Sequence, residues 1–366
     1  MEYICKHHIH LQLNNMRIIR YVLFPFSCIY WCITYIRNVM FDKGIISQSA
    51  FPIPIISFGN ITVGGTGKTP HTQYLISKLQ HTHSVATLSR GYKRKTKGYV
   101  DTTQTEITPQ IIGDEAFMTH KNFPNCIVAV CEKRVVGVQS ILTKHPHINC
   151  IILDDAFQHR HILPGYQILL VDYTRPIWND FVFPTGNLRE GTYAVARAHA
   201  VIVTKCPFIT DDIKKMWRKK LRLQAHQKLF FSSISYGKPY AMFSKKHVDS
   251  LSKLLENKHV ILITGLARAD SLYQYIQTYT AHLVHFEYPD HYEYTTTDIA
   301  DIVNATKNIS EYVIVTTEKD MHKLHFAGLP DTVNGYVIPI EPTFDDESAF
   351  LQEITNYLSQ NSLKNQ

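Results

Sequence analysis

At 366 residues the chain is long enough for two domains with separate hydrophobic cores, because domains average roughly 150 residues. Hydrophobic residues make up 45% and charged residues 19%, and the seven cysteines form no CxxC pair, which excludes a disordered chain and a disulfide miniprotein and argues against structural zinc. The net charge of +7 favours an anionic partner, such as a phosphate ester, nucleic acid or acidic lipid surface, without choosing among them.

The N-terminal region predicts a membrane-associated helix. Residues 1–15 are polar and His-rich, and without a second ligand cluster we expect a disordered extension, with Met16 as an alternative start. Residues 21–36 carry no charge and are flanked by arginines; as a helix they would be about 24 Å long, short of the roughly 30 Å bilayer core. We therefore expect residues 16–48 to lie in or dip into the inner-leaflet interface as an uncleaved helix, with a buried core helix as the alternative.

The rest of the chain predicts an α/β fold of two domains, with mostly parallel sheets flanked by helices, because β-branched runs alternate with longer helical stretches. In a first domain, residues 49–227, the expected strands are Pro54–Phe58, Val85–Ser89, Ile127–Val130, Cys150–Leu153, Ile168–Val171 and Val201–Thr204. In a smaller domain, residues 246–366, they are His259–Thr264, Leu283–Phe286, Tyr312–Thr316 and Tyr336–Pro339. Between the domains, Lys228–Phe243 reads as two alternating runs about a turn, which predicts a two-stranded linker over residues 228–245.

The most specific motif, in residues 55–70, is an apolar strand that runs into a glycine-rich loop and opens a helix. It matches the phosphate-binding pattern G-x-x-x-x-G-K-[ST] except that Thr62 replaces the first glycine. Backbone N–H groups of such a loop cradle phosphates, Lys68 can neutralise their charge, and the Thr69 hydroxyl can face Mg²⁺. The expected nucleotide-binding residues are Thr62, Val63, Gly64, Gly65, Thr66, Gly67, Lys68 and Thr69.

The nucleotide is expected to be ATP. The guanine-reading pattern [NT]KxD is approached only by residues 204–207, which lack the Asp, and by residues 317–320, which have the wrong order. Val63 stands where partition-type ATPases carry an additional Lys, so a dimeric ATPase switch is less favoured than a kinase.

Several polar strings could complete such a site. Asp154 and Asp155 end an apolar strand, the form that a metal-holding Asp takes beside a phosphate loop. Asp114 and Glu115 precede an apolar helical stretch, where a helix cap explains them as well as a catalytic role does. Arg90 belongs to a basic loop that is either solvated or meets an anionic head group.

Two further strings are weak when taken alone. Arg189 and Glu190 follow a Pro-Thr-Gly loop, where Arg could face phosphate and Glu the metal. His291 lies in a turn after a strand and could be structural or catalytic.

Together these strings resemble the tetraacyldisaccharide 4′-kinases of lipid A biosynthesis. The motifs that carry the resemblance are GNITVGGTGKTP (59–70), SRGY (89–92), GDE (113–115), LDDAFQHR (153–160), PTGNLRE (184–190), TKCP (204–207), YPDHYEY (288–294) and TTEKD (316–320). The resemblance implies transfer of the ATP γ-phosphoryl group to the 4′-hydroxyl of an acylated disaccharide 1-phosphate, forming lipid IVA, at the cytoplasmic face of the inner membrane.

The resemblance also implies a set of roles. Asp114 would be the general base with His291 as its partner, reaching it from the other domain on cleft closure. Lys68 would bind the phosphates. Thr69 would share Mg²⁺ with Asp154, Asp155 or Glu190. The further site residues would be Glu115, Gln158, His159, Arg189 and Arg90.

Two other functions stay open at this point. One is a phosphate-loop kinase of another membrane-borne sugar, and the other is a membrane-bound ATPase switch, which would lack an acceptor-dependent rate. Nucleic-acid binding is not expected, because the basic residues are not interleaved with aromatic residues along an extended face. We expect a monomer.

Overall fold

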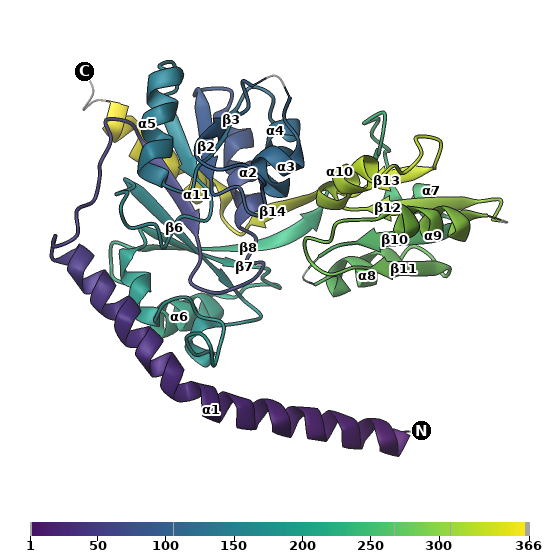
Figure 1. Ribbon diagram of the computed structural model, residues 1–366, viewed down its shortest axis with the longest axis horizontal. Helices are drawn as coiled ribbons and strands as arrows, with labels where there is room; N and C mark the ends of the chain where they lie inside the picture. The colour runs from purple at the N-terminus through teal and green to yellow at the C-terminus, as the bar shows by residue number, and fades with distance from the viewer. Residues whose placement is uncertain (1, 105, 267, 308, 363–366) are drawn as a thin grey trace. The chain divides into compact units, whose positions relative to one another are not determined.

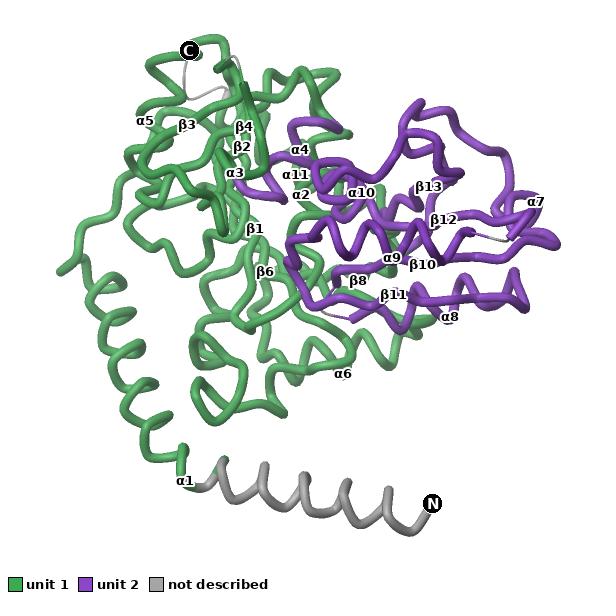
Figure 2. The backbone as a smooth tube through the Cα atoms, turned by 45° about the vertical axis from the view of Figure 1, so that its right-hand side comes forward, with its two compact units in different colours: residues 1–112, 123–234, 342–366 green, residues 113–122, 235–341 purple. Residues whose placement is uncertain are grey.

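The computed structural model describes residues 2–104, 106–266, 268–307 and 309–362, without the side chains of residues 2–19, 21 and 362. The chain forms two compact units (Figure 2). Unit 1 comprises residues 1–112, 123–234 and 342–366, and unit 2 comprises residues 113–122 and 235–341. The short segment 113–122 therefore belongs with the second unit, although strands of unit 1 precede and follow it in the sequence.

Unit 1 is built on a nine-stranded sheet with the order β14-β8-β7-β6-β1-β5-β2-β4-β3. Figure 1 labels several of these strands, among them β2, β6, β7 and β8. The strands are β1 (Ile55–Gly59), β2 (Val85–Ser89), β3 (Val100–Asp101), β4 (Ile127–Val130), β5 (Cys150–Leu153), β6 (Tyr166–Asp172), β7 (Ala200–Thr204), β8 (Lys228–Tyr236) and β14 (Ile340–Phe344). Pairings from β4 through β8 are parallel, and β3 runs antiparallel to β4. The six strands predicted for the first domain are all present, which confirms the predicted α/β class.

Helices cover this sheet because its central strands are apolar on both faces. The helices of unit 1 are α1 (Glu2–Asp42), α2 (Lys68–Leu79), α3 (Pro109–Ile112), α5 (Arg134–Lys144), α6 (Asp211–Lys220) and α11 (Glu347–Ser362), with 3-10 turns at Ile177–Asn179 and Thr192–Arg197. One buried cluster joins Leu153 to Ile141 of α5, and another joins Val203 to Trp217 of α6.

Unit 2 contains a five-stranded sheet with the order β11-β10-β12-β13-β9. Its strands are β9 (Tyr240–Ala241), β10 (His259–Thr264), β11 (Leu283–Glu287), β12 (Tyr312–Thr316) and β13 (Gly335–Val337). Among the described strand pairings of this second sheet, that of β9 with β13 is antiparallel and the others are parallel. Its helices are α4 (Asp114–Asn122), α7 (Leu251–Leu255), α8 (Asp270–Gln277), α9 (Thr296–Thr306) and α10 (Glu318–Phe326). The packing of α4 on α10 explains why residues 113–122 belong to this unit.

The linker differs from the hairpin predicted over Lys228–Phe243. β8 pairs with β7 and neighbours β14, whereas β9 joins the second sheet. The second linker strand therefore comes from about a hundred residues later in the chain, and residues 342–366 return to unit 1. The local alternation of apolar and polar residues predicts a strand, but it does not specify which distant strand will pair with it.

Helix α1 includes the one segment of the described residues, Val22–Asp42, that is long and apolar enough to cross a membrane. Apolar side chains along it are exposed, among them Phe26, Ile29, Ile33 and Ile36. The helix is consistent with the predicted membrane association. The extension predicted over residues 1–15 lies outside the part of the chain whose side chains are described.

Candidate functional site: a phosphate loop and an aspartate–histidine–lysine cluster

The glycine-rich loop joins β1 to α2 and presents the start of that helix. Gly67 is the N-cap of α2 and has φ of 84°, a left-handed conformation that favours glycine. The first N–H groups of a helix have no intrahelical partner, so this end of α2 is suited to bind phosphate. Gly59 lets the loop that follows β5 approach closely, because a Cβ added at Gly59 would lie only 2.5 Å from the Cβ of Phe157.

Polar contacts from neighbouring strands fix the shape of the loop. Asn60 Nδ2 donates to Thr66 Oγ1 at 2.8 Å, and Thr204 Oγ1 donates to the Thr66 carbonyl at 3.0 Å. Lys205 Nζ donates to the Gly65 carbonyl at 2.6 Å. The sequence Thr204-Lys205 therefore supports the loop backbone.

The two carboxylates that follow β5 lie at the start of α2. Thr69 Oγ1 donates to Asp154 Oδ2 at 3.3 Å, and both side chains are buried. Lys68 Nζ is 3.6 Å and Arg189 Nη1 is 3.1 Å from Asp155 Oδ1. Burial raises the pKa of Asp155, but the charges of Lys68 and Arg189 outweigh burial and hold this pKa below its usual value. Asp155 is therefore ionised at neutral pH.

This donor set fits Mg²⁺. The Thr69 hydroxyl and the Asp154 and Asp155 carboxylates are hard oxygen ligands, and Mg²⁺ is commonly held by one or two carboxylates together with water and substrate phosphates. The described residues contain no group of three or more His, Cys, Asp and Glu side chains that could hold a metal by themselves. A Mg²⁺ here would therefore take its remaining ligands from nucleotide and water.

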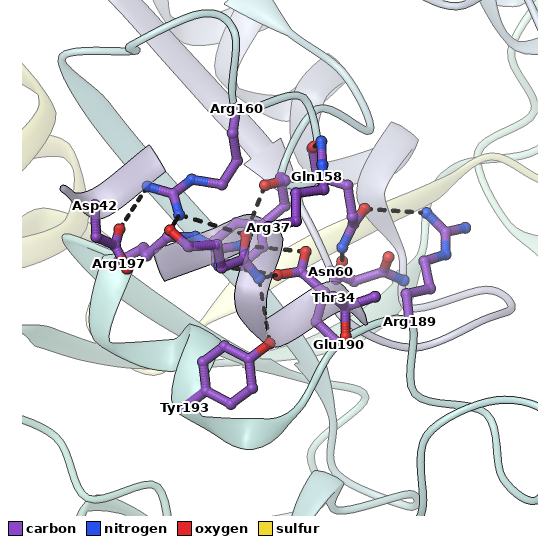
Figure 3. A network of polar contacts seen from close by, with 12 residues as sticks. Thr34, Arg37, Asp42, Asn60, Gln158, Arg160, Arg189, Glu190, Tyr193 and Arg197 are labelled. Carbon is purple, nitrogen blue, oxygen red and sulfur yellow. Dashed lines mark hydrogen bonds and ion pairs between the residues drawn. The ribbon is translucent and has the colours of Figure 1, made fainter. Parts of the chain in front are cut away.

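Glu190, the fourth predicted metal ligand, has both carboxylate oxygens engaged by other side chains (Figure 3). Arg197 donates to them at 2.9 and 3.2 Å, and Asn38 Nδ2 of α1 donates to Oε2 at 2.7 Å. Asn38 and Glu190 are each 1% exposed. These contacts favour a structural role for Glu190, and its assignment as a metal ligand stays a prediction.

Gln158 and Arg189 lie between α1 and the phosphate loop. Tyr30 Oη and Arg37 Nη2 of α1 donate to the carbonyls of Arg189 and Gln158, each at 3.0 Å. Arg189 Nη1 donates to Gln158 Oε1 at 3.4 Å, and Gln158 Nε2 donates to the Asn60 carbonyl at 2.8 Å (Figure 3). Hydrogen bonds from α1 therefore reach two predicted site residues that lie beside the phosphate loop.

A second cluster lies within unit 2. Asp114 begins α4, with half-buried Glu115 beside it, and His291 Nδ1 lies 3.5 Å from Asp114 Oδ2. Lys323 Nζ of α10 lies 2.7 Å from the same oxygen. Asp114 and His291 therefore meet inside one unit, contrary to our expectation that His291 reaches Asp114 from the other domain. The packing of α4 on α10 is the reason.

The electrostatics of this cluster keep Asp114 ionised. Burial raises the pKa of Asp114, but hydrogen bonds and charge from His291 and Lys323 outweigh burial, so the pKa lies below its usual value. His291 adopts φ of 58°, an uncommon conformation for a residue other than glycine, and such strain is concentrated at functional sites.

The buried Arg134 and the neutral His159 lie near the carboxylates of unit 1. Burial lowers the pKa of His159 to about 4, helped by the charge of Arg134, so His159 is neutral at pH 7. Arg134 is 3% exposed, and its Nε and Nη2 have no hydrogen-bond partner among the described residues. Burial lowers the Arg134 pKa to about 10 against the opposing charges of Asp155 and Asp154. The exposed Arg90 contributes positive charge to both groups.

Arg134 and Lys323 were not predicted from the sequence. Arg134 opens α5, and a cation in the first turn of a helix opposes the helix dipole, which is a signal that could have drawn attention to it. Lys323 lies in the helix that begins within the motif TTEKD, but its contact with Asp114 depends on tertiary packing.

A strand–loop–helix phosphate site with a Thr–Asp pair at the helix start is the mark of a phosphate-loop protein, and such proteins include phosphotransferases. The sequence profile of the family described as tetraacyldisaccharide-1-P 4′-kinase (LpxK) matches residues 19–359, and the chain belongs to this family.

Individual relatives agree with this assignment. The tetraacyldisaccharide 4′-kinase of Phocaeicola vulgatus is 42% identical over 350 residues, covering 93% of this chain and 95% of the relative. That of Flavobacterium psychrophilum is 38% identical over 351 residues, covering 94% and 98%. The crystal structure of LpxK from Aquifex aeolicus in complex with ATP has a TM-score of 0.72 and 27% identity, covering 93% of this chain and 99% of that one.

The activity follows from the family. The chain is an ATP-dependent phosphotransferase with tetraacyldisaccharide 4′-kinase activity in lipid A biosynthesis. The leading hypothesis from the sequence is confirmed, and the other-sugar kinase and the ATPase switch are set aside.

Proposed function

We propose that the two clusters divide the chemistry of this kinase between them. The phosphate loop and Lys68 bind the ATP phosphates, and Thr69 with Asp154 and Asp155 holds Mg²⁺, which when bound neutralises charge on the phosphates. Asp114 is the general base for the 4′-hydroxyl of the tetraacyldisaccharide 1-phosphate. The contacts of the Asp114 carboxylate with Lys323 at 2.7 Å and His291 at 3.5 Å, which favour its ionised form, are the observation that carries this proposal.

The proposed reaction transfers one proton and one phosphoryl group. The acceptor O–H bond breaks and its proton passes to the Asp114 carboxylate. The acceptor oxygen bonds to the γ-phosphorus, the bond from that phosphorus to the β–γ bridging oxygen breaks, and ADP leaves with the electron pair. Phosphoryl transfer depends mainly on positioning and charge stabilisation, so Lys68 and Arg189 are assigned to the developing negative charge on the phosphoryl oxygens. The products are ADP and lipid IVA.

The cytoplasmic face of the inner membrane is the proposed location. The acyl chains of the substrate cannot leave a bilayer easily, since each buried CH₂ contributes about 0.8 kcal/mol. The exposed apolar side chains of α1 would bring the enzyme to the lipid, as a monomer.

The test is transfer of labelled γ-phosphate from ATP and Mg²⁺ to tetraacyldisaccharide 1-phosphate in detergent micelles. Asp114→Asn keeps the size of the side chain and removes the base, so kcat should fall by about 10²-fold or more while the KM for ATP changes little. An unchanged kcat would remove Asp114 from the mechanism. Thr69→Val should instead raise the Mg²⁺ concentration needed for half-maximal rate.

A further inference from the structure

Lys323 makes the shortest contact to the proposed base. Its Nζ lies 2.7 Å from Asp114 Oδ2, compared with 3.5 Å for His291 Nδ1. The side chain of Lys323 is 8% exposed and that of Asp114 is 20% exposed. An ammonium group is costly to bury without a partner, so this contact is a built ion pair rather than a casual surface one.

Lys323 and His291 approach the same oxygen of Asp114. The hydrogen bonds and ion pairs among the described residues account for Oδ2 and place no partner on Oδ1. The partly exposed carboxylate is thus fixed on one side and keeps its second oxygen for an incoming hydroxyl. This is the arrangement expected of a base whose direction is set by its supporting residues.

Lys323 also has a purely structural contact. Its Nζ donates to the carbonyl of Tyr292 at 3.1 Å, which ties α10 to the turn that carries His291. A test must therefore separate the loss of this structural contact from the loss of the positive charge beside Asp114. A Gln can retain a donor to the Tyr292 carbonyl, whereas it lacks the charge.

Other charged or titratable groups lie on the elements around Asp114. They are Glu115, His120 and Lys121 on α4, Asp290 and His291 in the turn, and Glu318, Lys319, Asp320, His322, Lys323 and His325 on α10. Of these, Lys319 is engaged by Asp290 at 2.6 Å, and the carboxylate of Asp114 is contacted by His291 and Lys323.

We propose that Lys323 is a positioning residue for the kinase reaction, which fixes the Asp114 carboxylate through its charge so that Oδ1 faces the acceptor hydroxyl. The proposal rests on the assignment of Asp114 as the base. In this role Lys323 touches neither substrate, and its electrostatic contribution is to keep Asp114 ionised despite burial. The lowered pKa of Asp114 agrees with this role.

The test compares Lys323→Met, Lys323→Gln and Lys323→Arg in the full chain, with kcat and KM measured across a pH series in detergent micelles. Loss of the charge should lower kcat by about tenfold or more with little change in the KM for ATP. Because the protonation of ATP affects variant and wild type alike, its effect cancels when the kcat/KM of the variant is divided by that of the wild type at the same pH. For Met and Gln this ratio should fall further as the pH falls, because the pKa of Asp114 rises when the ammonium is lost. Arg should restore most of the rate.

Controls separate the possible failures. Lys121→Met removes a charge from the exposed face of α4 and should leave both kcat and the pH profile unchanged. Thermal unfolding checks that each variant is folded. If Gln behaves as wild type, or if Met lowers the rate equally at every pH, Lys323 makes only a structural contact and the proposal is wrong. If Asp114→Asn retains full activity, the assignment of the base fails instead, and the two failures are distinguishable.

Discussion

Replacing Glu190 by Gln decides between two roles for this side chain, a metal ligand or half of a buried ion pair. The substitution keeps the volume and removes the charge that faces Arg197. The two side chains are 2% and 13% exposed, and their nearest atoms are 2.9 Å apart. Breaking such a pair leaves the guanidinium without compensation, which costs about 3–5 kcal/mol. If unit 1, with about 250 residues, unfolds as one unit, that is a fall of roughly 6–20 °C in the midpoint of thermal unfolding.

The assay is thermal unfolding of Glu190→Gln with and without Mg²⁺ and ATP, beside a matched control. Glu347→Gln removes the same charge from an exposed ion pair with Lys78. The side chains of Lys78 and Glu347 are 41% and 47% exposed, so this substitution should cost less than about 1 kcal/mol. We expect Glu190→Gln to be destabilised equally with and without Mg²⁺. An unchanged midpoint together with a higher Mg²⁺ requirement for catalysis would refute the ion-pair reasoning and restore Glu190 as a ligand.

Four other substitutions have expected outcomes. Gly59→Ala should destabilise the fold by about 1–3 kcal/mol in chemical denaturation, because its Cβ meets Phe157 at 2.5 Å. Burial raises the pKa of Asp101 but hydrogen bonds lower it to about 2, so Asp101 stabilises the fold above about pH 4 and loses this effect as the pH falls towards 2; the stability gap to Asp101→Asn should shrink over that range. Asn38→Leu should cost about 1–3 kcal/mol, since Glu190 loses a buried donor. Ile33→Ser should weaken sedimentation with anionic vesicles, since it removes apolar surface without adding charge, while leaving thermal unfolding unchanged.

Local pattern was enough to predict most strands of both sheets. The runs at Val85–Ser89, Ile127–Val130, Cys150–Leu153, His259–Thr264 and Tyr312–Thr316 have the predicted bounds, because each is a short buried stretch of a parallel sheet between polar segments. The phosphate loop was predictable for the same reason, since its strand, glycines and helix start are contiguous in sequence.

Features that depend on distant partners were not predictable. The pairing of β8 with β14 joins strands about a hundred residues apart, and nothing in the alternation of Lys228–Tyr236 specifies that neighbour. The ion pair of Asp114 with Lys323 likewise requires α4 to pack on a helix two hundred residues later. Glu190 illustrates a related ambiguity. A carboxylate beside an Arg in a loop predicts a metal ligand or an ion pair equally well, and only the position of Arg197 and Asn38 favours the ion pair.

Helix α1 is held to unit 1 by buried hydrogen bonds and by aromatic contacts, and this bears on what its other face meets. Ser27 and Asn38 lie on one side of the helix, where both are buried and hydrogen-bonded to loops of unit 1. Ile29, Ile33 and Ile36 lie on the opposite side and are about 60% exposed, at 58%, 61% and 58%. Exposing such a row to water is unfavourable by roughly 25 cal/mol for each Å² of apolar surface. Because buried polar groups already bind the helix to the protein, its apolar row is left for a non-aqueous neighbour, which for an enzyme with an acylated substrate is most simply the lipid surface itself.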